Sequence, residues 1–255
     1  MGILNITPDS FSDGGNFFSP KNALLQVEKM IADGVDIIDI GAQSTRPNAT
    51  RVSAKEEIIR LGKIITQIKK EFPNIIISLD TYYADVVRFG ADEGIDLVND
   101  ISGGQFDVEM LKAVADACLP YILMHCNPEI NLMHQQLIKS DILLEVNRYF
   151  SCKIKEILEY GIKDIILDPG FGFGKSVEQN HQLIDELSYI NLGKNPILVG
   201  ISRKSFIYKP LGKLPTEIVL ETQHLHLKAL KNGAKILRVH DVMETKNTLD
   251  IFLGT

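Results

Sequence analysis

The sequence predicts an α/β protein that folds as a single (β/α)8 barrel, a TIM barrel, over residues 1–255. Short apolar runs alternate with helical patterns along the whole chain. Glycines that can end a helix stand a few residues before several of these runs, as expected of short loops leading into parallel strands. Each run also ends in a polar residue. A doubly wound sheet is the alternative, but no dinucleotide-binding turn favours it.

The apolar runs are short and are bounded by Gly, Pro or polar residues, which is typical of buried strands in a parallel sheet. We expect eight of them, at Gly2–Asn5, Ile37–Ile40, Ile75–Leu79, Leu97–Asn99, Tyr121–Met124, Ile165–Leu167, Ile197–Val199 and Ile236–Val239.

The clearest helical pattern covers Lys55–Glu71, where apolar residues recur every three or four positions. Ser53 and Glu56 form a predicted capping box at its start. A second helix is expected over Thr216–Asn232, with Gly233 as its stop. The same kind of glycine stop precedes three other strands, at Gly34, Gly94 and Gly161.

Composition narrows the class of protein. Charged residues make up 24% and hydrophobic residues 45% of the chain, which are ordinary globular values. The net charge of −6 argues against a nucleic-acid surface. No apolar run approaches the roughly 20 residues of a membrane span. The three cysteines form no C-x-x-C pair, so we expect free thiols in a reducing cytoplasm.

The segment Ile165–Lys175 combines a buried strand, the carboxylate of Asp168 and a glycine-rich turn. A phosphate-binding P-loop would need glycine where Pro169 stands, so Lys175 does not complete that motif. The glycine spacing also fails the dinucleotide fingerprint. A carboxylate at the end of a buried strand is costly unless it has a partner or a function. Phe173 remains available as an apolar wall beside it.

Polar residues at the ends of parallel strands meet at the carboxyl-terminal face, where barrel enzymes carry their active sites. Asp80, Asn99 and Asp168 come from three different strands. Carboxylate and amide groups of this kind suit a flat heterocycle with an amino-imine edge, such as a pterin or a purine. A metal cluster is the competing interpretation, but no histidine stands at ligand spacing beside this trio.

Cationic residues supply a second side of the predicted site, and arginine forks and lysine charges both match phosphate groups. These residues are Arg46, Arg203, Lys204, Arg238 and His240. Arg203 is equally well interpreted as a surface cation. Ser205 is expected at a helix amino terminus, a natural anion site. Two loops rich in turn formers, Thr7–Gly15 and Ser44–Asn48, follow the first two strands and are expected over the same face.

Segments along nearly the whole chain resemble, in order, the signatures of dihydropteroate synthases. These segments are Gly2–Gly15, Asp39–Pro47, Asn99–Gly104, Asp168–Lys175, Ser202–Ser205 and Arg238–His240. Two departures stand out. Ala42-Gln43 replaces the usual Gly-Glu, and His125-Cys126-Asn127-Pro128 departs from the usual Met-His-Met continuation.

The resemblance implies an enzyme of folate synthesis that joins 4-aminobenzoate to 6-hydroxymethyl-7,8-dihydropterin diphosphate. It also implies a homodimer that sulfonamides inhibit. Pterin would be held by Asp80, Asn99, Asp168 and Lys204. Diphosphate would be held by Asn5, Arg46, Arg238 and His240, with Mg²⁺ near Asn5. Catalysis would rest on Asn5, Lys204, Arg238 and His240. The aminobenzoate would be framed by Phe11, Thr45, Pro47, Phe173 and Ser205, with Lys204 touching both substrates.

Such a reaction needs no strong base, because Mg²⁺ and arginine make diphosphate a good leaving group and the pterin ring stabilises a cation at its exocyclic carbon. An S_N1-like departure followed by amine attack therefore agrees with the lack of a nucleophile–base pair in the sequence. Two alternatives remain: a pterin-dependent methyltransferase domain, which needs no diphosphate clamp, and a pterin-binding protein without catalytic activity.

Overall fold

The computed structural model describes residues 1–6, 20–43, 51–126, 138 and 140–254. Eight parallel strands follow one another around a single sheet in sequence order. The ring closes where Gly2 and Val239 form a parallel bridge between the first and last strands. The strands are β1 (Gly2–Asn5), β2 (Ile37–Gly41), β3 (Ile76–Asp80), β4 (Leu97–Asp100), β5 (Tyr121–Met124), β6 (Ile165–Asp168), β7 (Ile197–Val199) and β8 (Ala234–Leu237). The predicted barrel is therefore confirmed.

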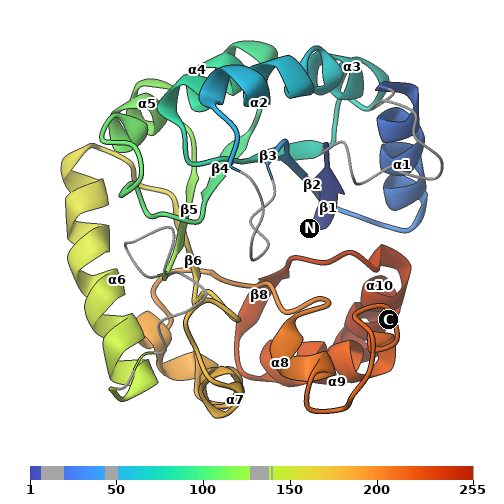
Figure 1. Ribbon diagram of the computed structural model, residues 1–255, viewed down its shortest axis with the longest axis vertical. Coiled ribbons are helices and arrows are strands. Elements are labelled where there is room, and N and C mark those ends of the chain that lie inside the picture. Colours follow the sequence, from blue (N-terminus) through green and yellow to red (C-terminus); the bar gives the residue numbers. More distant parts are fainter. Residues whose placement is uncertain (7–19, 44–50, 127–137, 139, 255) are drawn as a thin grey trace.

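Helices surround the strands and cover the outside of the barrel (Figure 1). Their bounds are α1 (Pro20–Ala32), α2 (Ala54–Leu61), α3 (Ile64–Glu71), α4 (Ala84–Glu93), α5 (Met110–Asp116), α6 (Ile142–Glu159), α7 (Val177–Asp185), the 3-10 helix η2 (Leu187–Gly193), α8 (Ser205–Tyr208), α9 (Val219–Lys231) and α10 (Val242–Leu253). Within the described ranges no helix is long and apolar enough to cross a membrane. The three cysteines are free thiols.

The predicted helix over Lys55–Glu71 is wrong in one respect, because it consists of two helices. α2 ends at Leu61 and α3 begins at Ile64. Gly62 lies between them with φ of +50° and ψ of −124°, a conformation that only glycine adopts readily. Ser53 caps α2 as predicted, accepting a hydrogen bond from the Glu56 amide at 3.2 Å. The carboxylate of Glu56 pairs instead with Arg60 on the next turn.

The last strand also differs from its prediction. β8 covers Ala234–Leu237 rather than Ile236–Val239, because its register shifts against β7 next to Ile197. Val239 instead makes the bridge that closes the barrel. The four glycines predicted to end helices, at positions 34, 94, 161 and 233, all have positive φ, between +87° and +106°.

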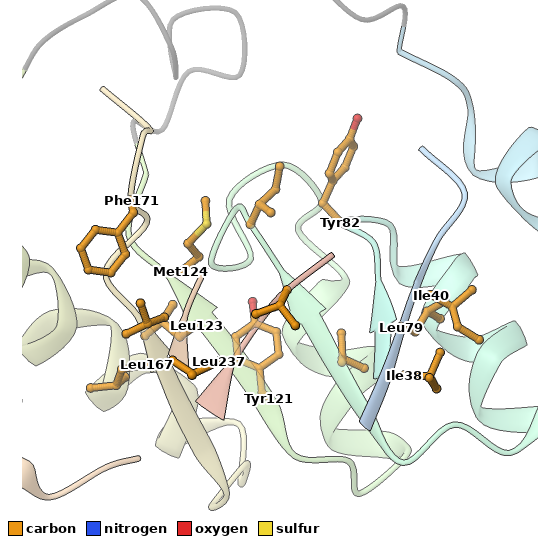
Figure 2. Close-up of a cluster of buried hydrophobic side chains, with 14 of the residues drawn as sticks. Ile38, Ile40, Leu79, Tyr82, Tyr121, Leu123, Met124, Leu167, Phe171 and Leu237 are labelled. Carbon is orange, nitrogen blue, oxygen red and sulfur yellow. The ribbon is translucent and has the colours of Figure 1, made fainter. Parts of the chain in front are cut away.

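Most of the apolar core lies between the barrel and its helices. Figure 2 shows part of it, with Ile38, Leu79, Leu123, Leu167 and Leu237 projecting from five different strands. A smaller group, the inner cluster, packs inside the barrel. It consists of Met1, Leu97, Ile122 and Leu198, with Ile37, Ile166 and Ile236 packed against them. Because side chains alternate along a strand, the residue two positions after an inner-cluster residue also faces the interior.

Candidate active site

A layer of polar side chains continues the inner cluster toward the carboxyl ends of the strands. Four of its members stand two residues after an inner-cluster residue, so strand alternation turns them into the barrel. The pairs are Ile37 with Asp39, Leu97 with Asn99, Ile166 with Asp168, and Ile236 with Arg238. Asp80 joins the layer because it lies beside Gly41 on β2 and Asn99 on β4 in the sheet register. The predicted convergence of Asp80, Asn99 and Asp168 is therefore seen in the fold.

Arg238 lies between two carboxylates at the centre of this layer. Its Nε donates to Oδ2 of Asp39 at 2.6 Å, and its Nη2 donates to Oδ2 of Asp80 at 2.6 Å. Burial lowers the pKa of Arg238, but the two carboxylates outweigh burial and raise this pKa above its ordinary value. Oδ2 of Asp39 also accepts from Nδ2 of Asn99 at 3.1 Å. The sequence predicted no role for Asp39.

Asp168 ends β6 on the opposite side of the barrel. Its Oδ1 accepts from the amide of Gly170 at 2.8 Å, so the glycine turn fixes the carboxylate. Burial raises the pKa of Asp168. Gly200 lies beside both Asp168 and Arg238, since a Cβ built there would make ordinary contacts with Oδ2 of Asp168 at 4.0 Å and Cβ of Arg238 at 3.9 Å.

Lys204 comes from the loop after β7. Its Nζ stands 4.2 Å from the centre of the Phe173 ring, a cation–π contact. Burial lowers the pKa of Lys204 to about 8, although Asp168 opposes the shift. A Cβ at Gly172 would come within 3.2 Å of Cδ of Lys204, so the glycine allows this close approach. Lys204 and Phe173, which the resemblance assigns to one site, are thus in contact.

Lys175 has a structural role that was not predicted from the sequence. Its ammonium contacts the carbonyls of Gly170 at 2.8 Å and Phe173 at 3.1 Å, and Nδ1 of His125 at 3.0 Å. Burial, together with the charge of Lys175, holds the pKa of His125 well below its ordinary range. The ring is therefore neutral, and its Nδ1 can accept from Lys175 when that amine is protonated. Lys175 draws together the turn that carries both Asp168 and Phe173.

Two more of the predicted cations, His240 and Arg203, lie after β8 and β7. Oγ of Ser202 lies 3.0 Å from Nδ1 of His240, which follows Arg238 by two residues. Arg203 pairs with Asp241 at 2.6 Å, so its charge serves this ion pair. Ser205 begins the short helix α8, as expected.

A family model described as pterin binding enzyme matches residues 1–240. A dihydropteroate synthase from Synechocystis is 45% identical over 245 residues, which are 95% of this chain and 84% of the relative. The chain belongs to the pterin binding enzyme family, among its dihydropteroate synthases.

Solved structures of dihydropteroate synthases are also similar to this chain. The Yersinia pestis enzyme in complex with a sulfonamide drug has a TM-score of 0.93 and 38% identity, covering 100% of this chain and 92% of that one. The Xanthomonas albilineans enzyme with 4-aminobenzoic acid has a TM-score of 0.92 and 35% identity, covering 100% and 91%.

One departure from the dihydropteroate synthase signature forms a buried network. Gln43 stands where the family usually has Glu, and its Nε2 donates to Oε1 of Glu57 at 2.7 Å. Thr81 donates to the other oxygen of Glu57 at 2.9 Å, and the amide of Val52 donates to Oε1 of Gln43 at 2.9 Å. Burial raises the pKa of Glu57 to about 7. The network joins the chain on both sides of residues 44–50.

Four of the residues assigned by resemblance to dihydropteroate synthases lie outside the described residues, so their placement stays a prediction. They are Phe11, Thr45, Arg46 and Pro47. Asn5 ends β1 beside Gly41 of β2, at the same end of the barrel as the polar layer. Among the described residues, no group of three or more His, Cys, Asp or Glu side chains could hold a metal ion.

Proposed function

We propose that this chain condenses 4-aminobenzoate with 6-hydroxymethyl-7,8-dihydropterin diphosphate, giving 7,8-dihydropteroate and pyrophosphate. The observation that carries the proposal is the polar layer inside the barrel mouth, in which Asp80, Asn99 and Asp168 surround Arg238 beside Lys204. Family membership and the named relatives support the same reaction.

Pterin recognition follows from the hydrogen-bonding capacity of this layer. An ionised carboxylate only accepts hydrogen bonds, so Asp168 suits the N–H groups along the pyrimidine edge of a pterin. Asn99 and Asp80 add polar atoms from two neighbouring strands. Lys204 supplies donors for the ring oxygen and nitrogen, and Phe173 supplies the apolar surface under it.

Diphosphate departure requires positive charge at the mouth of the site. We assign this charge to Arg238 and Arg46, with His240 and Asn5 as further contacts of the diphosphate. Arg238 uses Nε and Nη2 to hold Asp39 and Asp80, which leaves other N–H groups of its guanidinium for a phosphate oxygen. Because the dihydropterin ring stabilises the resulting cation, the arylamine attacks without a side chain acting as a strong base.

Mg²⁺ would bind at this site with few protein ligands. The ion commonly binds through one or two protein oxygens, keeping water and substrate phosphates as its other ligands. Asn5 offers one amide oxygen at the strand-end face, so it would be one such ligand. When bound, Mg²⁺ would neutralise the diphosphate and make it a better leaving group.

We place 4-aminobenzoate against Phe173 and Ser205, with Phe11, Thr45 and Pro47 completing the wall. Ser205 begins α8 directly after Lys204, so both substrates meet at Lys204. A sulfonamide drug, which like 4-aminobenzoate has an aromatic amine and an acidic group, would compete for the same place.

A homodimer in the cytoplasm is the expected state of this chain. The outer helices expose large apolar side chains, including Leu220 on α9 and Ile251 on α10, and a second copy would cover surface of this kind. Light scattering on the purified protein should give twice the chain mass. A monomer at micromolar concentration would contradict this expectation.

Pyrophosphate release tests the reaction directly. We expect release that depends on 4-aminobenzoate, with coupled formation of dihydropteroate. Lys204→Ala should weaken the binding of both substrates, whereas Lys163→Ala, an exposed lysine before β6, should not. A methyltransferase domain or a silent pterin-binding protein would bind the pterin without releasing pyrophosphate, and that result would overturn the proposal.

A further inference from the structure

Asp39 is the most deeply buried carboxylate of the polar layer, with none of its surface exposed. A single oxygen, Oδ2, accepts from both Asn99 and Arg238, at 3.1 and 2.6 Å. The other oxygen, Oδ1, is buried and has no hydrogen-bond partner among the described residues. A buried carboxylate held only for stability is normally satisfied at both oxygens, so this arrangement needs another explanation.

We propose that Asp39 is a positioning residue that sets which pterin-like rings the site accepts, by fixing the amide of Asn99 and the guanidinium of Arg238. The inference rests on the pterin-binding function proposed above. Asp39 acts through its two neighbours, whose free atoms face the ligand.

The argument for Asn99 starts from the chemistry of an amide. Its oxygen and nitrogen ends are nearly equal in shape, and only a partner decides their orientation. An ionised Asp39 can only accept, so Asn99 must turn its NH₂ group toward it. Oδ1 of Asn99 therefore remains as an acceptor for the ligand, in the same layer as the carboxylates of Asp80 and Asp168. A ligand edge rich in N–H donors, such as a 2-amino-4-oxo pyrimidine edge, matches this layer.

The argument for Arg238 is geometric. Asp39 holds Nε and Asp80 holds Nη2, so two contacts on different nitrogens fix the plane of the guanidinium. Asp80 alone would leave the guanidinium free to rotate about the remaining contact. Asp39 thus determines the direction in which the other N–H groups of Arg238 point.

The decisive test compares two ligands that differ in one group. Binding of 6-hydroxymethylpterin and of its 2-oxo counterpart, 6-hydroxymethyllumazine, would be measured by calorimetry for the wild-type chain and for Asp39→Asn. In the variant, the new amide lets Asn99 flip and offer NH₂ to the ligand. We expect pterin affinity to fall roughly 10-fold to 100-fold while lumazine affinity holds or rises, so the selectivity collapses.

Asp100→Asn is the matched control. Asp100 is equally buried at the end of β4 but binds backbone amides and Tyr121. It should lose stability without losing pterin selectivity. Unchanged selectivity in Asp39→Asn, or an equal loss in Asp100→Asn, would overturn the inference while leaving the proposed function intact. Wild-type protein that binds neither ring would instead contradict the proposed function.

Asn99 offers a second test if Asp39→Asn fails to fold. The isosteric Asn99→Asp places a carboxylate against Asp39, whereas Asn99→Ala only removes the amide. If Asp39 faces Asn99 as a carboxylate, Asn99→Asp must weaken pterin binding more than Asn99→Ala does. The reverse order would show that Asp39 does not orient this position.

Discussion

Two carboxylates near the same end of the barrel differ in the side of the strands they occupy. Asp39 on β2 faces the barrel interior, and its partners are the side chains of Asn99 and Arg238. Asp100 on β4 faces outward. It accepts from the amides of Ser102 and Gly104 at 2.7 and 2.8 Å, and from the Tyr121 hydroxyl at 2.6 Å.

The difference separates a structural carboxylate from a functional one. Asp100 is satisfied mainly by the chain that follows it, so its surroundings form with the fold and do not depend on a ligand. The inward layer is satisfied by side chains that share partners, and one oxygen of Asp39 has none among the described residues. Burial is equal in the two cases, so burial alone does not identify the site. The hydrogen-bond donors do identify it, because they are side chains for Asp39 and mainly backbone amides for Asp100.

The largest expected effect comes from removing the cation of the inward layer. Arg238→Met leaves Asp39 and Asp80 without their shared partner, and breaking a buried ion pair in this way costs about 3–5 kcal/mol. Urea unfolding should show this loss, and pyrophosphate release should disappear. Arg203→Met, which breaks the more exposed pair with Asp241, should cost about 1 kcal/mol or less. Equal losses would remove the distinction between the two pairs.

Asp168→Asn should act mainly on ligand binding. The amide must point an N–H group where the carboxylate accepted, and a hydrogen bond to a charged group contributes about 1.5–3 kcal/mol. We expect calorimetry to show weaker pterin binding, with a smaller change in 4-aminobenzoate binding measured in the presence of pyrophosphate and Mg²⁺. Unchanged pterin affinity would exclude Asp168 from the pterin site.

Asp100→Asn should reduce stability and leave ligand binding unchanged, the reverse of what we expect for Asp168→Asn. Its amide cannot accept from all three donors, and leaving one buried donor unpaired costs about 1–3 kcal/mol. Thermal unfolding should therefore shift downward, while the pterin affinity of the folded protein stays at the wild-type value. A selective loss of pterin binding without a loss of stability would mean that the outward side also belongs to the site.

Replacing Glu57 should have the smallest effect on stability, and that effect should depend on pH. Because burial raises the pKa of Glu57 to about 7, the folded chain keeps a proton that the unfolded chain releases near pH 4.5. The free energy of unfolding therefore falls as pH rises from about 4.5 to about 7 and then levels. Glu57→Gln should flatten this fall by on the order of 1–2 kcal/mol, measured by urea unfolding at pH 5 and pH 8. An identical pH slope in the variant would show that Glu57 does not titrate in this range.

The fold was largely predictable because local patterns and the barrel agree. Apolar runs, glycine stops and polar strand ends located all eight strands to within about two residues. The misplaced end of β8 depended on its register with β7, which is a tertiary property. Gly62 could have signalled the break between α2 and α3, but an unbroken apolar periodicity on both sides outweighed it.

The site could be predicted only where a polar side chain stood at the end of a recognisable strand. Asp80, Asn99 and Asp168 end their strands and could be grouped from sequence. The role of Asp39 was missed because its partners Asn99 and Arg238 come from distant parts of the chain, so only the barrel brings them together. Glu57 stands four residues before Leu61 on the apolar face of α2, which could have marked it as buried. Its partners Gln43 and Thr81 come from other elements, so only the fold brings them together.

The bridge between Gly2 and Val239 has a consequence for the order of assembly. Arg238 meets Asp80 and Asp39 across 158 and 199 residues of chain, and it follows β8, which is synthesised after the other seven strands of the barrel. At roughly 5–20 residues per second, the carboxylates of β2 and β3 wait many seconds for their cation. Until β8 arrives, the carboxylates of these two adjacent strands have no arginine between them and repel one another. Closure of the ring and neutralisation of this charge are therefore one event, and the binding site forms only after β8 has been synthesised.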